Sequence, residues 1–458
     1  MKHPIAILIP LIAIGLLWLS LLPVPKSPAQ INAEFEVFFR TAVKLPSVEY
    51  IQNIIKKTGK QPVVNKQFIE KMNSELPKQT VATKTAELNE ISQFRYDRLS
   101  PCNKFRLLNL KSKLTDQLNV LETKHSDENF DAREDENIER KRLQQLRYMN
   151  KIKGYSGSNM TFDDLIKYGK SEVDKALKGL STLETEIISQ GLASSLDEFQ
   201  TNYVNSFSRE EDIIEAFNAR RPIIEENLSK LFLEYDLPPT KIVASRKLDF
   251  VYAIGTYTPV RYIFHFYWDG ESFLGKDLDY LMIHELVPGH HMQNVLIRRG
   301  TTCTGDKGLP NSPRSRYSRS FMEGWATYIE EFGPELGLFQ TFEQRLGYWD
   351  WQLIRSHRVI LDARLHHDNW LWEQFESYWI DHLPERLQNL AEREYKRLRR
   401  MPLQTHTYKF GADAILKLRN REEARLGDDF DIRKFHDKLL RMGQVPMDIL
   451  EDSYAALP

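Results

Sequence analysis

The stretch DYLMIHELVPGHHMQ, at residues 279–293, decides how the rest of the chain is interpreted. It contains the pair His284-Glu285 and, a little further on, the pair His290-His291. A histidine-glutamate pair followed by another histidine on the same helix is how many zinc hydrolases present two imidazole ligands and a general base. The stretch therefore makes a metal-dependent hydrolase the first hypothesis.

The spacing of the histidines departs from the usual pattern. The second histidine normally follows the first by four residues, because residues i and i+4 lie on one face of a helix. In this chain the fourth position is Pro288, and Gly289 follows it. Proline has no N–H and clashes with the carbonyl of the preceding turn, and glycine costs about 1 kcal/mol relative to alanine inside a helix. We therefore expect the helix to bulge or break at this pair.

The break decides which histidine is the second imidazole. If two residues are looped out, His290 returns to the helix face of His284. In an unbroken helix His290 would lie roughly 240° around the axis, and His291 would recover the face about 10.5 Å further along. We favour His290 as the ligand and keep His291 as the alternative.

A second stretch, FMEGWATYIEEF at residues 321–332, predicts an amphipathic helix with Glu323 near its start. By itself a charged residue on a helix usually lies on a solvated face. A glutamate on a later helix is, however, the third zinc ligand of thermolysin-like enzymes, which leave one position for water. Together with His284 and His290, Glu323 predicts a site for one Zn²⁺.

The bulk composition excludes other classes of protein. The 458 residues carry a net charge of −1 with 28% charged residues, so the two signs are interspersed and a basic nucleic-acid groove is not expected. There are two cysteines, Cys102 and Cys303, which are too few for a disulfide framework or a thiolate zinc site. Whether these two cysteines pair is left open by the sequence.

The chain begins with a candidate targeting segment. Residues 5–22 form an apolar run whose length lies between a signal-peptide core and a minimal membrane span. Small residues at Ser27 and Ala29 offer a cleavage site, and no cysteine lies nearby to carry a lipid. We expect residues 1–29 to be a signal peptide or an N-terminal membrane anchor. The protein would then be exported, periplasmic or extracytoplasmic, and anchored in the inner membrane if the segment is retained.

The remaining pattern predicts a mainly α fold with a small β-sheet. Residues 30–236 have apolar residues at three- and four-residue spacing, which is typical of helices. Runs rich in β-branched and aromatic residues at 241–244 and 262–268 predict strands. We expect the second run to be an edge strand that pairs with extended substrate. Residues 237–458 would form a zincin-like catalytic region enclosed by long helices, in one continuous domain with the helices before it.

Smaller signals refine this prediction. Thr161 is expected to cap a helix, and residues 301–319 are expected to form a loop that covers the site. Three long helices are expected at residues 339–364, 370–382 and 384–400. The charged and apolar residues at the end of the first of these are expected to face, in part, a cavity.

Several blocks in order resemble the bacterial domain-of-unknown-function family 885: HELVPGHHMQ, EGWATYIEE, RVILDARLHHDNW, PLQTHTYKFGADAILKLR and FDIRKFHDKLLRMGQVP. The resemblance runs from about Met160 to Leu450 and is firm after Tyr262. That family is placed among the metallopeptidases with a thermolysin-like (gluzincin) architecture. The resemblance implies a reaction class and no substrate.

The first functional hypothesis is a zinc-dependent peptidase that cleaves peptide or amide bonds. Glu285 would take a proton from a zinc-activated water and give it to the leaving amine. Tyr408 is the first candidate for a donor to the carbonyl oxygen, and His366 is the second. Arg364 and Arg419 are candidates for binding a substrate carboxylate.

Two alternatives remain open. One is a hydrolase of another bond, such as an ester. The other is a non-catalytic, membrane-anchored helical binding protein, against which the intact Glu285 argues. On every one of these hypotheses we expect no nucleic-acid partner, and contact with a membrane only through the N-terminal segment.

Overall fold

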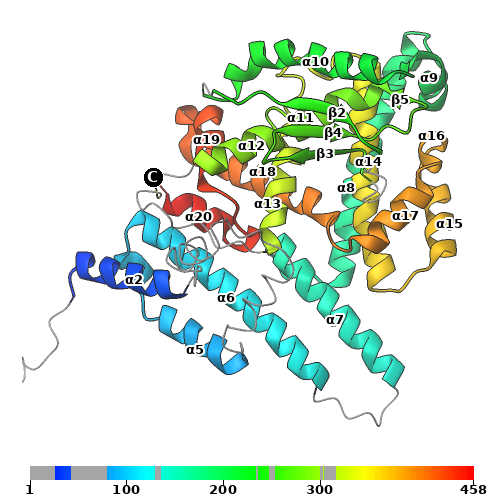
Figure 1. Ribbon diagram of the computed structural model, residues 1–458. Coiled ribbons are helices and arrows are strands. Elements are labelled where there is room, and N and C mark those ends of the chain that lie inside the picture. Colours follow the sequence, from blue (N-terminus) through cyan, green and yellow to red (C-terminus); the bar gives the residue numbers. More distant parts are fainter. Residues whose placement is uncertain are drawn as a thin grey trace, which may run out of the picture.

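The computed structural model describes residues 26–42, 80–128, 136–233, 236–246, 253–299, 303 and 316–457. Its helices are α2 (Pro28–Ala42), α5 (Val81–Ile91), α6 (Pro101–Glu128), α7 (Glu136–Ser156), α8 (Phe162–Ser189), α9 (Leu196–Tyr203), α10 (Glu210–Asn227), α11 (Leu278–Glu285), α12 (His290–Arg299), α13 (Arg319–Glu330), α14 (Phe342–His366), α15 (Trp372–His382), α16 (Glu385–Gln388), α17 (Ala391–Arg400), α18 (His406–Leu426), α19 (Ile432–Met442) and α20 (Leu450–Ala456). Its strands are β1 (Ser206–Phe207), β2 (Lys241–Ala244), β3 (Gly255–Thr258), β4 (Ile263–Phe266) and β5 (Phe273–Leu274). The predicted class, mainly helical with a small sheet, is confirmed (Figure 1).

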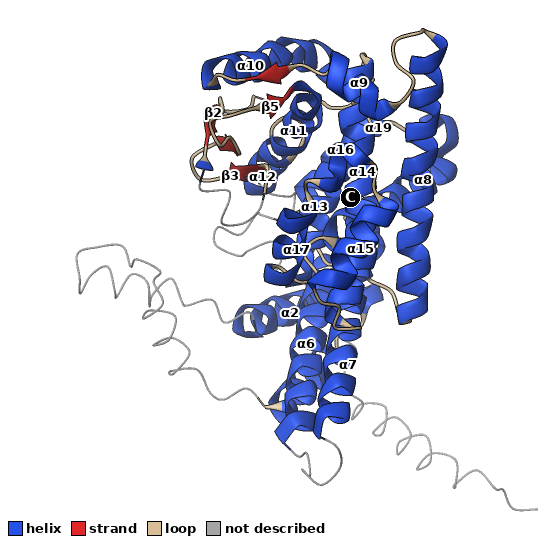
Figure 2. Cartoon of the chain, turned by 90° about the vertical axis from the view of Figure 1, so that its right-hand side faces the viewer, coloured by secondary structure: helices blue, strands red, loops and turns tan. Residues whose placement is uncertain are grey.

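The main sheet lies at one end of the molecule, with α10 over it, and the long helices α6 and α7 extend at the other end (Figures 1 and 2). Its strand order is β2-β4-β3, with β2 parallel and β3 antiparallel to β4. The predicted strand at 241–244 is β2, and the one at 262–268 contains β4.

The prediction that residues 262–268 form an edge strand is wrong. They form the central strand, because β3 pairs with β4 on the side away from β2. Phe264 and Phe266 of β4 are fully buried and pack on the ring of Phe217 from α10. The edges of this sheet are therefore β2 and β3, and β3 is the one that packs against α11.

Helices from the two halves of the chain share one core. Helix α8 packs along α14, and α13 packs along α18. A separate, smaller apolar cluster joins α2, α5 and the first half of α6 through side chains such as Phe35, Ile91 and Leu110. The part of the chain that positions the histidine-glutamate pair is thus the main core.

A disulfide links Cys102, in the first turn of α6, to Cys303, between α12 and α13. The two cysteines are 201 residues apart in the sequence. Arg106 supports the link by donating from Nη2 to the carbonyl of Cys303. The pairing that the sequence left open is therefore present.

Local predictions are confirmed where the structure describes them. Thr161 caps α8, and its side chain and that of Asp164 form a capping box. The three predicted long helices are α14, α15 and the pair α16 and α17, where the last is interrupted. Most of the predicted loop at 301–319, and residues 1–25 of the predicted leader, lie outside the described residues. In the described ranges no helix is both long and apolar enough to cross a bilayer.

Candidate metal centre

The predicted break in the helix is present, and it brings two histidines together. Helix α11 ends at Glu285 and α12 begins at His290, with four residues between them that are not helical. Gly289 makes this path possible, because a Cβ added there would lie 2.0 Å from the carbonyl oxygen of His284. No other residue fits such a close approach of backbone to backbone.

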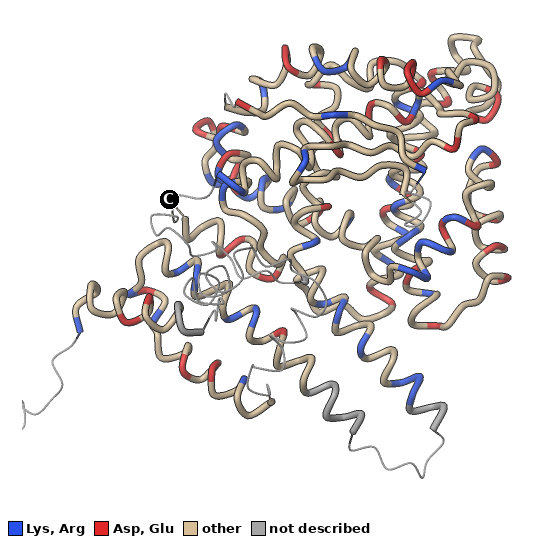
Figure 3. The backbone as a smooth tube through the Cα atoms, in the orientation of Figure 1, with Lys and Arg blue, Asp and Glu red and all other residues tan. Residues whose placement is uncertain are grey.

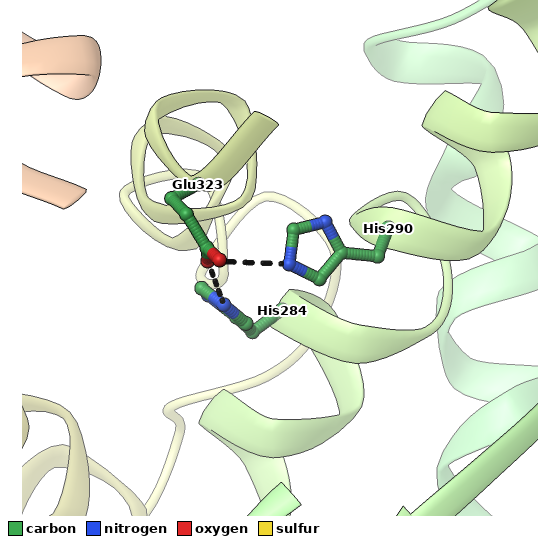
Figure 4. A group of neighbouring side chains, drawn as sticks. All are labelled: His284, His290 and Glu323. Carbon is green, nitrogen blue, oxygen red and sulfur yellow. Dashed lines mark ion pairs between the residues drawn. The ribbon is translucent and has the colours of Figure 1, made fainter. Parts of the chain in front are cut away.

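His284, His290 and Glu323 form one cluster (Figure 4). Their ligand atoms all lie within 4.8 Å of one another. Nε2 of His284 lies 3.7 Å from Oε2 of Glu323, and Nε2 of His290 lies 3.5 Å from the same oxygen. Tetrahedral zinc, with bonds of about 2.0–2.1 Å, separates its ligand atoms by roughly 3.3 Å. The three side chains therefore fit a zinc ion with one position left open.

His291, the alternative ligand, points away from this cluster. Its Nε2 donates to the carbonyl of Pro238 at 2.9 Å, and its Nδ1 accepts from the hydroxyl of Tyr257 at 2.7 Å. Both ring nitrogens are thus engaged, Nδ1 with β3 and Nε2 with the segment that precedes β2. Burial lowers the pKa of His291 to about 4, which keeps the ring neutral.

Glu330 holds the other nitrogen of His284. Its Oε1 accepts from Nδ1 of His284 at 2.7 Å, and its Oε2 accepts from Nη1 of Arg355 at 2.5 Å. Such a hydrogen bond fixes the ring and the tautomer of a metal-binding histidine. Glu330 follows Glu323 by seven residues on α13, a spacing that places both on one helix face and that could have revealed it.

Asp279, at the start of the same stretch, does not orient the ligands. Its carboxylate pairs with Arg220 Nε at 2.5 Å and accepts from the backbone N–H of Phe339 at 3.0 Å. It lies more than one helical turn before His284, so its side chain faces α10 instead of the cluster.

The charges in the cluster suit a cation. Burial lowers the pKa of His284, but its hydrogen bonds with Glu323 and Glu330 outweigh burial and raise the pKa to about 9. Burial raises the pKa of Glu323, and the two histidines outweigh it, so that this carboxyl titrates well below its usual range. A charged carboxylate lies between two imidazoles, the arrangement that a bound metal ion also stabilises.

Glu285 lies next to the cluster and is buried. Burial raises its pKa, while His290 and His284 lower it to a smaller extent. Its Oε2 is buried and has no hydrogen-bond partner among the described residues. The neighbouring Gly255 lets β3 approach, since an added Cβ would lie 2.8 Å from Leu281 and 3.5 Å from Cγ of Glu285. An unsatisfied buried carboxylate facing a cavity is what a general base needs.

Two adjoining cavities meet at Glu285. The outer cavity has a volume of about 300 Å³ and includes His290, Glu323 and residues of β3 in its wall. The inner cavity has a volume of about 40 Å³ and includes His284. Glu285 and Tyr408 line both cavities, so both side chains lie at their boundary.

Tyr408 lies beside His284 and lines both cavities. Its ring centroid is 5.8 Å from that of His284. Its hydroxyl oxygen accepts from Nη2 of Arg397 at 3.2 Å and from Nε2 of Gln404 at 3.0 Å. Both partners are donors, so the hydroxyl proton is available for an oxygen of a ligand. Burial, followed by Glu323, raises the pKa of Tyr408 and keeps that proton in place.

A close crossing of α13 and α18 brings Tyr408 to Glu323. A Cβ on Gly324 would lie 2.3 Å from Cα of Gly411. Only two glycines at the crossing allow the helix axes to approach this far. The EGWA block and the KFGA block are therefore complementary surfaces of one contact.

The other three candidate residues lie away from the cluster. His366 pairs through Nε2 with the carbonyl of Leu398 at 3.0 Å. Arg364 forms an ion pair with Asp368, and Arg419 forms one with Glu423. None of the three lines either cavity in the described part of the chain.

Arg364 and His366 lie outside both cavities because of their position along α14. The residues of this helix that face the inner cavity are Trp351, Arg355 and Arg358. Arg364 and His366 follow Arg355 by nine and eleven residues, or roughly 13–17 Å along the axis. The prediction that part of residues 358–366 faces a cavity is thus confirmed by Arg358, whereas Arg364 and His366 lie further along the helix.

Sequence reasoning also missed the basic residues of α17. Arg393 and Arg397 line the inner cavity, and Arg397 lines the outer one as well. Figure 3 shows the run of basic positions along this helix, while acidic and basic positions are interspersed over most of the molecule. In the sequence the run AEREYKRLRR is indistinguishable from a solvated helix face.

The fold is similar to solved structures of bacterial proteins. One from Colwellia psychrerythraea, described as a "putative lipoprotein", matches with a TM-score of 0.57 and 20% identity, over 97% of this chain and 79% of the other. One from Shewanella oneidensis, described as a "putative lipoprotein of unknown function", matches with a TM-score of 0.54 and 17% identity, over 96% of this chain and 90% of the other. At these identities the likeness shows the fold alone.

The comparison with curated proteins gives no match. Residues 33–453 match the family model described as "Bacterial protein of unknown function (DUF885)". This match covers most of the helices and all of the site described above. The chain therefore belongs to the DUF885 family of bacterial proteins.

Proposed function

We propose that this protein is a zinc-dependent hydrolase that cleaves peptide or amide bonds, with a zincin-like (gluzincin) catalytic region around α11, α12 and α13. The observation that supports it is the convergence of His284, His290 and Glu323 beside the unpartnered carboxylate of Glu285. Two imidazoles and one carboxylate are a common protein ligand set of catalytic zinc.

When bound, zinc supplies a Lewis acid that lowers the pKa of a water molecule and polarises a carbonyl. Glu285 removes a proton from a water at the boundary of the two cavities and returns it to the leaving amine. Tyr408 donates its hydroxyl proton in a hydrogen bond to the carbonyl oxygen as negative charge develops there. Glu330 keeps Nε2 of His284 directed at the cluster by accepting from Nδ1.

The strand β3 provides the track for the substrate. Gly255, Thr256 and Tyr257 line the outer cavity, and β3 is an edge of its sheet. An extended peptide can add to such an edge through backbone hydrogen bonds. Such an edge favours a peptide over an isolated ester as the substrate.

The protein is proposed to act outside the cytoplasm. The two similar solved structures are described as lipoproteins, which are exported proteins. The apolar run at residues 5–22 is the kind of segment that directs export.

The direct test uses the purified full-length chain. Its zinc content is measured, and a mixture of synthetic peptides is incubated with it and analysed by mass spectrometry. About one zinc per chain and cleavage of peptides are expected, and both should disappear in His284→Ala and Glu323→Ala. A native chain that holds no zinc, or cleavage that persists without zinc, contradicts the proposal.

A further inference from the structure

The inner cavity is lined by four arginine side chains, and the three candidate metal ligands do not explain this feature. They are Arg355 and Arg358 from α14 and Arg393 and Arg397 from α17. Among the described residues that line this cavity, Glu285 is the one with a carboxylate. Removing cations from water is costly unless opposite charge lies close to them. The balance of charge around this cavity therefore indicates what it binds.

Two of the four arginines are neutralised by buried carboxylates that do not line the cavity. Nη1 of Arg355 lies 2.5 Å from Oε2 of Glu330. Arg358 binds Glu394 through both Nε and Nη2, at 2.7 and 2.8 Å. Glu330 and Glu394 are both fully buried. The charges of Arg355 and Arg358 are therefore balanced by these two ion pairs.

Arg393 adds positive charge beyond these pairs. Nη2 of Arg393 lies 3.6 Å from Glu394, a carboxylate that already binds Arg358 through both oxygens. Nε of Arg393 is buried and has no hydrogen-bond partner among the described residues. Nη2 of Arg397 donates to Oε1 of Gln404 and to the hydroxyl of Tyr408. The described side chains that line the inner cavity thus offer four guanidinium groups and one carboxylate.

The size of the inner cavity limits what can enter. Its volume is about 40 Å³, against about 300 Å³ for the outer cavity. Since one water needs about 10–15 Å³ of such space, only a few non-hydrogen atoms fit, on the order of a carboxylate group. A peptide chain that ran on through this cavity would have no room.

We propose that the inner cavity binds a carboxylate of the substrate, and that this group is the free carboxyl end of a peptide. The inference rests on the proposed function, because it places the scissile bond at Glu285 and Tyr408 between the two cavities. The amino-terminal part of the peptide lies along β3 in the outer cavity. Arginine binds a carboxylate through two parallel hydrogen bonds, which suits the planar end of a peptide. The cleavage is then at the end of the chain.

The arginines that do this are not those that the sequence suggested. Arg364 and Arg419 lie outside both cavities, whereas Arg393 and Arg397 lie within the inner one. Arg393 is the better position for a test, because Arg397 also holds the hydroxyl of Tyr408. Loss of Arg397 would disturb a catalytic residue together with the subsite.

The substrate test uses matched sets of N-acetylated tripeptides with the full-length, zinc-loaded chain. Each set contains a free carboxylic acid, its carboxamide, and a carboxamide with glutamate as the last residue. We expect kcat/KM for the acid to exceed that for the amide at least tenfold, on the order of 100-fold, from charge-assisted hydrogen bonds. Equal cleavage of acid and amide would overturn the inference. Cleavage of the glutamyl amide as fast as the acid would overturn the assignment to the chain end and leave a side-chain carboxylate as the ligand.

The variant test uses Arg393→Met, with Arg364→Met as the matched control outside the cavities. The ratio of acid to amide cleavage should fall at least tenfold in Arg393→Met and stay unchanged in the control. This ratio is insensitive to a general loss of activity or of folded protein. A ratio that Arg393→Met leaves unchanged would contradict the role of this arginine.

A binding measurement separates this inference from the proposed function. N-acetylphenylalanine and its carboxamide are titrated calorimetrically into the native chain and into Arg393→Met. Tighter binding of the acid to the native chain, with no peptide cleaved in any set, would leave the carboxylate subsite standing and overturn the hydrolase. Cleavage of peptides without any preference for the acid in binding or turnover would support the hydrolase and overturn the carboxylate subsite.

Discussion

Nδ1 of His284 lies 2.7 Å from Oε1 of Glu330, although 46 residues separate the two in the sequence. The same carboxylate binds Arg355 through its other oxygen. One buried glutamate thus orients a metal ligand and neutralises an arginine of the inner cavity. This link connects the group formed by His284, His290 and Glu323 to the arginines of the inner cavity.

Replacing Glu330 should therefore weaken zinc binding without removing a ligand. In Glu330→Gln the amide can still accept from His284, but it carries no charge for His284 or Arg355. We expect the affinity for zinc to fall about 10–100-fold. Competition with a chelator of known affinity measures this, and Glu331→Gln, at the residue just after α13, is the control. An unchanged affinity would mean that Glu330 only packs against α14.

Replacing the proposed base should separate chemistry from binding. Glu285→Gln is nearly isosteric and removes the carboxylate that takes the proton from water. We expect zinc content and thermal unfolding to be retained, while kcat falls by a factor of about 10²–10⁴ or more. The readout is the rate on the peptide that the native chain cleaves fastest. Near-native turnover would remove Glu285 from the mechanism.

The two adjacent histidines should respond in opposite ways. His290→Ala removes a side chain of the cluster, so we expect the loss of zinc with a fold that persists. His291→Ala removes the contacts with Tyr257 and Pro238, so we expect bound zinc to remain and the unfolding temperature to fall. Zinc content and thermal unfolding of the two variants give the answer. Loss of zinc only in His291→Ala would place the ligand on the other histidine.

Buried neutral histidines should make the protein sensitive to acid. Burial lowers the pKa of His436 to about 3, from a usual value near 6.5. Between these two pH values the unfolded chain binds a proton at this position and the folded chain does not. The free energy of unfolding should therefore fall as the pH falls through this window, by about 1.4 kcal/mol per pH unit.

The contribution of His436 can be isolated by substitution. His436→Gln keeps a side chain that can bond to Leu231 and Tyr328, the present partners, but does not titrate. Urea unfolding between pH 6 and 4 should show a shallower loss of stability than in the native chain. His382→Gln, at an exposed histidine, should leave the slope unchanged. Equal slopes in all three proteins would contradict the assignment.

The sequence by itself determined what depends on residues that are close together in the chain. Pro288 and Gly289 act on the turn that contains them, so the break between α11 and α12 could be predicted. That break carries His290 back to His284, because the path of four residues leaves little freedom. The helical class followed in the same way, since apolar spacing reflects a local period.

Only the tertiary structure decided which distant residues complete the site. Glu330, Arg393 and Arg397 resemble solvated charges in the sequence, and the packing of α13 and α17 against α14 and α18 turns them inward. The same packing leaves His366 and Arg419 outside, because each lies about three helical turns beyond a residue that lines a cavity, Arg355 on α14 and Tyr408 on α18. The pairing of β3 with β4 and of Cys102 with Cys303 likewise depends on contacts between separate elements. Such contacts are set by the shapes of whole helix faces, which no single stretch of the chain contains.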